Sequence, residues 1–168
     1  MITPEYCREM ARYNTWQNNG LRQLVSTMDK DALYQDRGAF FGSIMRTLNH
    51  LLWGDTLWMS RFDGGSGTDL TIEESFDMAP TPAVWAGERF RMDARISLWA
   101  ESVHAVDLIG DLVWYSFAAA KQMSKPKAIC VMHLFNHQTH HRGQVHAMLT
   151  AAGQKPQATD LPFIPEAT

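Results

Sequence analysis

Apolar residues recur at steps of three and four along most of this chain, which is the spacing of amphipathic α-helices. The pattern predicts four long helices, over residues 4–28, 40–62, 81–109 and 124–153. Thr3-Pro4 and Thr81-Pro82 mark two of the starts, because a threonine can cap the helix and proline at its first position needs no backbone donor. Gly153 is a natural stop for the last helix.

The segments between these helices differ in character. Residues 29–38 are interpreted as a connection, and residues 63–80 as a long loop that permits a crossover between helices. Residues 111–118, DLVWYSFA, alternate in part and predict an extended segment or hairpin arm. The expected class is therefore all-α, with one helical-bundle domain over residues 1–168 and a short extended segment before the last helix.

Charge and composition exclude several classes of protein. The 168 residues carry 15 basic and 18 acidic side chains, a net charge of -3, whereas nucleic-acid binders normally present a positive face. No apolar run approaches the roughly 20 residues of a membrane span, and the N-terminal segment lacks the features of a signal peptide. Cys7 and Cys130 form no CxxC pair and are expected to be small core residues. We expect a cytoplasmic protein with a small-molecule substrate and neither nucleic acid nor membrane as partner.

Four of the seven histidines lie between positions 133 and 141. Residues four apart on a helix lie one turn above one another, so two imidazoles can meet at one ion. His133 and His141 are about 12 Å apart along the axis, too far to share an ion whose nitrogen bonds are about 2 Å long. A helical wheel places His141 on the apolar face, His137 at its edge, and His133 and His140 further out. The sequence therefore favours His137 and His141 as a metal-binding pair, with a third ligand from another helix.

The third ligand has fewer candidates. His50 lies in the second predicted helix beside Trp53 and Gly54, where it could be a ligand or a core histidine bonded to a backbone carbonyl. His104 follows Glu101 in a Glu-x-x-His pattern, but di-iron bundles use that pattern twice and the fourth helix has no glutamate. Neither an HExxH motif nor a glycine-rich phosphate loop is present.

Three segments and the tail carry a resemblance to a known family. They are ARYNTWQNNGL, LNHLLWGDTLWMSRF, HLFNHQTHHRGQVHAML and, near the C-terminus, TDLPFIP. With these motifs the chain resembles the DinB family over nearly its full length. The resemblance implies an up-down-down-up four-helix bundle, usually a homodimer, that holds one divalent ion through three histidines. By position these ligands are His50, His137 and His141.

The resemblance also sets expectations about activity. Some relatives are thiol-dependent S-transferases or isomerases that use bacillithiol, mycothiol or glutathione, and the family name records induction by DNA damage rather than DNA binding. Three imidazoles leave a coordination position open, as in catalytic zinc sites, so a metal-activated thiol or water can act as the nucleophile. We expect a metal-dependent transferase or hydrolase with zinc, or alternatively nickel or iron, and with a low-molecular-weight thiol as a candidate cosubstrate.

Two other readings remain open. The main alternative is a non-enzymatic stress-response protein with a structural or vestigial metal site. A DNA-binding damage-response factor is a weaker one, because the charge balance is unfavourable.

A homodimer also accords with the six tryptophans, since aromatic residues are enriched at the centres of interfaces.

Polar residues near the predicted ligands are candidates for supporting them. They are Asn49, Asp55, Gln138, Arg142 and Gln144. Asp55 or Gln144 could hydrogen-bond a ligand imidazole and fix its tautomer, or could simply be solvated. Arg142 could bind a carboxylate or phosphate, or form an ion pair at the surface or in a dimer.

Overall fold

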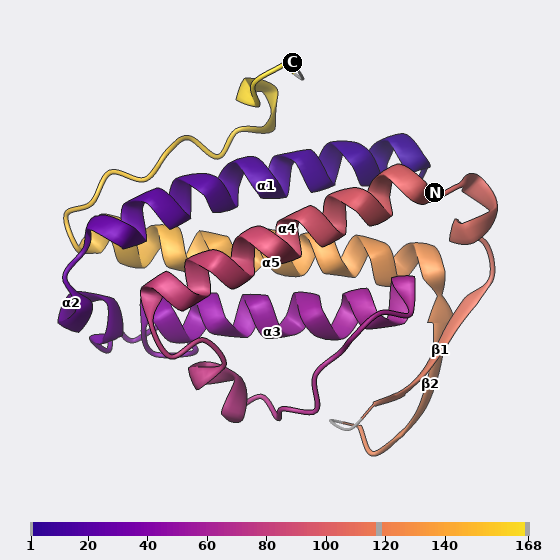
Figure 1. Ribbon diagram of the computed structural model, residues 1–168, viewed down its shortest axis with the longest axis horizontal. Helices are drawn as coiled ribbons and strands as arrows, with labels where there is room; N and C mark the ends of the chain where they lie inside the picture. The colour runs from indigo at the N-terminus through magenta and orange to yellow at the C-terminus, as the bar shows by residue number, and fades with distance from the viewer. Residues whose placement is uncertain (1, 117–118, 167–168) are drawn as a thin grey trace.

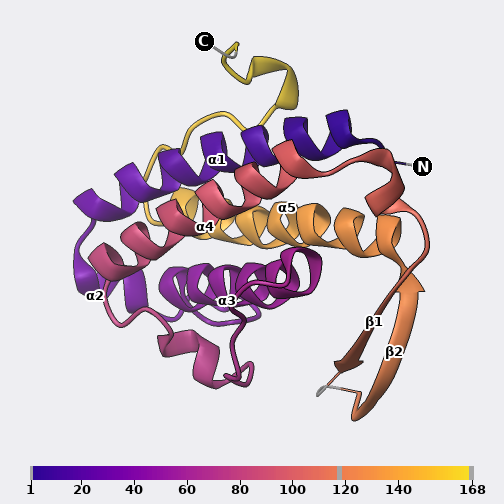
Figure 2. The same ribbon diagram turned by 45° about the vertical axis from the view of Figure 1, so that its right-hand side comes forward.

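The computed structural model describes residues 2–116 and 119–166, and it is mostly helical. Its α-helices are α1 (Pro4–Thr27), α2 (Lys30–Tyr34), α3 (Ile44–Asp63), α4 (Pro82–Ser102) and α5 (Lys127–Ala151). The four long helices lie side by side in both views (Figures 1 and 2). The colours of Figure 1 show that α1 and α5 run in one direction and α3 and α4 in the other.

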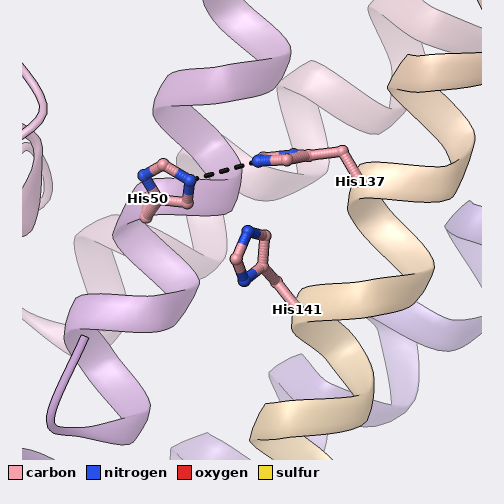
Figure 3. Close-up of side chains that lie close together, drawn as sticks. All are labelled: His50, His137 and His141. Carbon is pink, nitrogen blue, oxygen red and sulfur yellow. Dashed lines mark hydrogen bonds between the residues drawn. The ribbon is translucent and has the colours of Figure 1, made fainter. Parts of the chain in front are cut away.

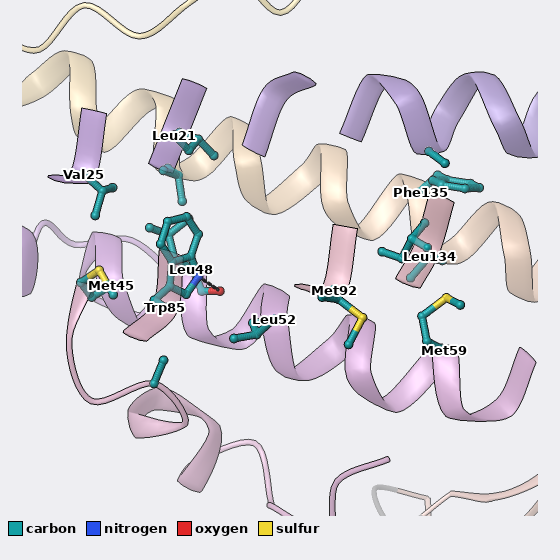
Figure 4. Close-up of a cluster of buried hydrophobic side chains, with 14 of the residues drawn as sticks. Leu21, Val25, Met45, Leu48, Leu52, Met59, Trp85, Met92, Leu134 and Phe135 are labelled. Atoms are coloured by element: carbon teal, nitrogen blue, oxygen red, sulfur yellow. Dashed lines mark hydrogen bonds between the residues drawn. The ribbon is translucent and has the colours of Figure 1, made fainter. Parts of the chain in front are cut away.

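The four long helices enclose one apolar core. α1 packs mainly against α4, and α3 mainly against α5. Figure 4 shows the meeting of their inner faces, with Leu48 of α3, Trp85 of α4 and Leu134 of α5 all at most 1% exposed. The indole of Trp85 donates a hydrogen bond of 3.2 Å to the backbone oxygen of Leu48, so its polar nitrogen is satisfied inside the core.

Side-chain caps fix where the long helices begin. The hydroxyl of Thr3 accepts from the backbone nitrogen of Tyr6, and that of Thr81 accepts from Val84. Both caps confirm the starts predicted from the two Thr-Pro pairs. Ser43 caps α3 through the backbone nitrogen of Arg46, so this helix begins later than the predicted position 40.

A two-stranded antiparallel sheet precedes the last helix. β1 (Asp111–Ser116) pairs with β2 (Lys121–Pro126), and the hairpin projects from one end of the helices (Figure 1). The predicted extended segment is thus one strand of a hairpin, and its last two residues, 117–118, lie outside the described residues. This sheet corrects the predicted all-α class: the structure is mostly helical and also contains a small two-stranded sheet.

Three other boundaries differ from the sequence prediction. Ser124 and Pro126 belong to β2, so the last helix begins at Lys127. α2 lies inside the predicted connection 29–38, where Asp29 caps it. α4 ends at Ser102, and a short 3-10 helix (Ala105–Leu108) follows it. None of the described helices is both long and apolar enough to span a membrane.

Candidate metal centre

Three histidines from two helices converge at the contact between α3 and α5. His50 comes from the N-terminal half of α3, and His137 and His141 lie one turn apart on α5 (Figure 3). The Nε2 atoms of His50 and His137 are 3.1 Å apart, and one ring nitrogen from each histidine lies within 4.8 Å of the others. Two nitrogens bound to one tetrahedral zinc ion would lie about 3.3 Å apart, given bonds of about 2.0–2.1 Å. The His50–His137 pair is at this spacing, and the three nitrogens together lie close enough that they could hold one ion.

The two neighbouring histidines of α5 do not join this group. His133 and His140 are both exposed, whereas His50 and His141 are 6% and 8% exposed. The His133 ring lies against Trp58, with 5.0 Å between ring centroids. The two α5 histidines that meet His50 are thus His137 and His141, the pair that the helical wheel favoured.

Burial keeps the three imidazoles in the form that binds metal. It lowers the pKa of His50 to about 4 and that of His137 to about 3, and the charges of neighbouring imidazoles contribute to both shifts. Burial also lowers the pKa of His141. All three rings are therefore neutral near pH 7, with nitrogen lone pairs available to a cation.

Gln144 fixes the tautomer of His141. The Nδ1 atom of His141 lies 2.7 Å from the Oε1 atom of Gln144. An amide oxygen only accepts hydrogen bonds, so Nδ1 carries the proton and Nε2 keeps its lone pair. The buried Nδ1 atoms of His50 and His137 have no hydrogen-bond partner in the part of the chain that the structure describes. The 3.1 Å approach of the Nε2 atoms of His50 and His137, together with the unprotonated Nε2 of His141, fits an ion on the Nε2 side of the rings.

Phe41 is a neighbour of the site that the sequence prediction missed. It lies just before α3, is 8% exposed, and its ring centroid is 4.1 Å from that of His50 and 5.3 Å from that of His141. The helix predicted over residues 40–62 includes this residue. Its position on the turn before Ser43 lets the ring cover one side of His50 and His141.

Among the described residues, Asp55 hydrogen-bonds core side chains rather than a ligand imidazole. It follows His50 by five residues, which on an α-helix is about 140° around the axis, so it faces the core. There its Oδ2 accepts from Arg89 at 2.6 Å and from the side-chain amide of Gln138. Arg89 also pairs with Asp93 of α4 at 2.9 Å. The expectation for Asp55 is corrected: it belongs to a buried ion-pair network beside the histidines.

Arg142 and Asn49 also have structural partners. Arg142 is buried, donates to Oε1 of Gln138 at 2.9 Å and lies 5.4 Å from the centre of the Tyr13 ring. Because it is buried against these residues, Arg142 is not the exposed surface ion pair that was considered for it. Burial lowers the pKa of its guanidinium to about 10. Asn49 bonds both the nitrogen and the oxygen of Ala79 and so anchors the connection before α4.

Comparison with known proteins identifies the family. The model of the DinB family matches residues 1–168. The chain belongs to the DinB family. Protein DinB of Bacillus subtilis (strain 168) is 24% identical over 158 residues, covering 93% of this chain and 91% of that protein. A DinB-like protein of Bacillus cereus has the same fold, with a TM-score of 0.71 at 16% identity over 93% of this chain and 97% of its own.

Proposed function

We propose that this DinB-family protein binds one divalent metal ion through His50, His137 and His141 and acts as a metal-dependent enzyme. The observation that carries the proposal is that no fourth histidine, cysteine, aspartate or glutamate joins the triad among the described residues. A structural zinc site is closed by four protein ligands, whereas a catalytic site has three and an open position. The proposed fold of the enzyme is the family's up-down-down-up four-helix bundle.

The proposed chemistry needs a nucleophile near neutral pH. A divalent ion held by three neutral imidazoles supplies Lewis-acid activation of a water or a thiol. Gln144 orients the ring of His141, and Phe41 shields one side of His50. We therefore propose a transferase or hydrolase with a small-molecule substrate. A low-molecular-weight thiol is its candidate cosubstrate, because some relatives that the chain resembles use one.

Zinc is the proposed ion, with nickel and iron(II) as alternatives. Imidazole ligands suit all three, and the general order of affinities does not select the ion that a cell supplies. Reconstitution of the metal-free protein with each ion, followed by a screen of thiol transfer and hydrolysis, tests this choice. Activity with iron alone would overturn the zinc assignment.

Alanine substitution of each ligand tests the metal site. His50→Ala, His137→Ala and His141→Ala should each abolish stoichiometric metal, measured by mass spectrometry after dialysis. His133→Ala and His140→Ala are matched controls from the same helix as two of the ligands and should retain one ion per chain. Full metal content in His141→Ala would refute the assignment.

The non-enzymatic alternative makes a different prediction for the loaded protein. A stress protein with a structural ion should lose thermal stability without metal but show no binding of thiols such as bacillithiol, mycothiol and glutathione. The proposed enzyme should bind at least one thiol or hydrolyse a substrate only when it is loaded. Metal retention without either activity would favour the stress-protein reading.

A further inference from the structure

Gly54 lies on α3, one turn after His50, and is buried against α5. A Cβ atom built at this glycine would lie 2.9 Å from the Cε1 atom of His137 and 3.4 Å from its Nδ1 atom. The three heavy atoms nearest to that position all belong to the His137 ring. The imidazole of His137 therefore occupies the space that any larger residue would need for its side chain.

This contact determines where the ring of His137 can lie. Its Nε2 atom approaches Nε2 of His50 to 3.1 Å across the two helices. An added methyl group at position 54 would be met by the end of a rotatable side chain rather than by backbone. The ring would then move while the helices stay in place. The substitution would therefore displace the proposed ligand nitrogen of His137.

We propose that Gly54 is a positioning residue for the metal site, in that the absence of its side chain provides the space for the His137 imidazole. This inference rests on the proposed metal-binding function. The inference predicts that Gly54→Ala weakens metal binding without weakening the fold, because alanine in a helix interior is favoured over glycine by about 1 kcal/mol. If Gly54 were needed only for the fold, Gly54→Ala would instead lower the stability of the metal-free protein and leave its Zn²⁺ affinity unchanged.

Gly54→Ala tests the proposal with zinc alone as the probe. Its Zn²⁺ affinity, measured by chelator competition, should fall by about 10- to 100-fold, the range found when the support of a metal ligand is removed. The melting temperature of its metal-free form should equal or exceed that of the wild type. Gly143→Ala is the matched control: it makes the same change on α5, with no heavy atom within 4 Å of the added carbon, and should leave Zn²⁺ affinity unchanged. Affinity within twofold of the wild type in Gly54→Ala would overturn the proposal.

A second measurement needs neither the variant nor the metal. In the metal-free wild type, the Hε1 proton of His137 should show a nuclear Overhauser effect to an α-proton of Gly54, since a Cβ in place of that proton would lie 2.9 Å from Cε1. Absence of this effect overturns the inference even if Gly54→Ala does not fold. Failure of the wild type to bind any divalent ion would instead refute the proposed function, and the contact would still be decided by this measurement.

Discussion

Gln144 is the polar neighbour that contacts a proposed ligand directly, through Nδ1 of His141 at 2.7 Å. Removing such a hydrogen bond frees the ring to rotate and to change tautomer, which typically costs about 10- to 100-fold in metal affinity. We predict this loss of Zn²⁺ affinity for Gln144→Ala, with an unchanged melting temperature of the metal-free protein. Gln23→Ala, on the exposed side of α1, is the control and should bind Zn²⁺ like the wild type. Equal affinities for both variants would remove Gln144 from the site.

The two cysteines are core residues in the structure. Cys7 is 0% and Cys130 3% exposed, and burial raises the pKa of the Cys7 thiol to about 11. Because the thiolate is the reactive form, neither thiol should react with Ellman's reagent at pH 8 in the native protein. Both should react in guanidinium chloride. Rapid reaction of a thiol in the native state would make that cysteine a candidate nucleophile.

Asp63, the last residue of α3, and Arg95 of α4 form an ion pair that joins these helices. Arg95 donates to both carboxylate oxygens of Asp63, each at 2.7 Å, and these bonds lower the pKa of Asp63 below 3.8. A lowered carboxylate pKa stabilises the fold above the unfolded pKa, and this contribution is lost as pH falls through the folded value. Asp63→Asn should therefore lower the free energy of unfolding by about 0.5–1 kcal/mol at pH 7, a small value because the pair is partly solvated. Urea titrations should show the difference shrinking as pH falls below the ordinary carboxyl pKa of 3.8 and through the lowered pKa of folded Asp63, and a difference independent of pH would contradict this account.

The elements that the sequence predicted well are those with local signals. α1 and α5 match closely because helical periodicity is long in both and Thr3 and Gly153 mark an end of each. α2 has only five residues, too few for a period to be seen. β2 has no alternating apolar residues, and its strand form comes from pairing with β1, where Trp114 lies opposite Met123. Such pairing across a turn cannot be read from β2 alone.

The residues of the candidate site also differ in whether a local sequence signal predicts them. His137 and His141 follow from spacing within one helix, whereas His50 is 87 residues away from His137 and needed the family resemblance. Asp55 was misplaced because a lone acidic residue carries no sign of its buried partners. Its partner Arg89 lies on α4, 34 residues further along the chain. Phe41 was missed since the start of α3 was predicted too early.

The distribution of charge over the whole molecule predicts that the protein does not bind DNA. Five of the ten arginines, at positions 8, 12, 89, 91 and 95, are already paired with carboxylates of the chain. Pairing leaves fewer cations to neutralise phosphates, the main source of non-specific affinity. A gel-shift titration with duplex and single-stranded DNA at low salt should show no complex at micromolar protein. A salt-dependent complex would revive the damage-response reading.

The outward face of α4 exposes three large apolar side chains to solvent. Phe90 and Leu98 are 59% and 72% exposed, and Val84 is 42% exposed. With 100° per residue these three and the small residues Gly87 and Ala94 fall within an arc of about 120°, which also includes the exposed charged residues Arg91 and Glu101. Exposed apolar patches of this kind mark interaction surfaces, and a two-fold dimer lets one patch cover its own copy.

We therefore predict a homodimer that buries this face of α4. Light scattering at micromolar concentration should give twice the chain mass of 19.1 kDa. Leu98→Asp should shift the protein to monomers, because dimerisation would then desolvate two carboxylates without partners. Phe163→Asp is the control, since Phe163 is similarly exposed at 69% but lies in the C-terminal tail, and this variant should remain dimeric. A monomer mass for the wild type would reject the dimer, and a dimer that survives Leu98→Asp would place the interface on another face.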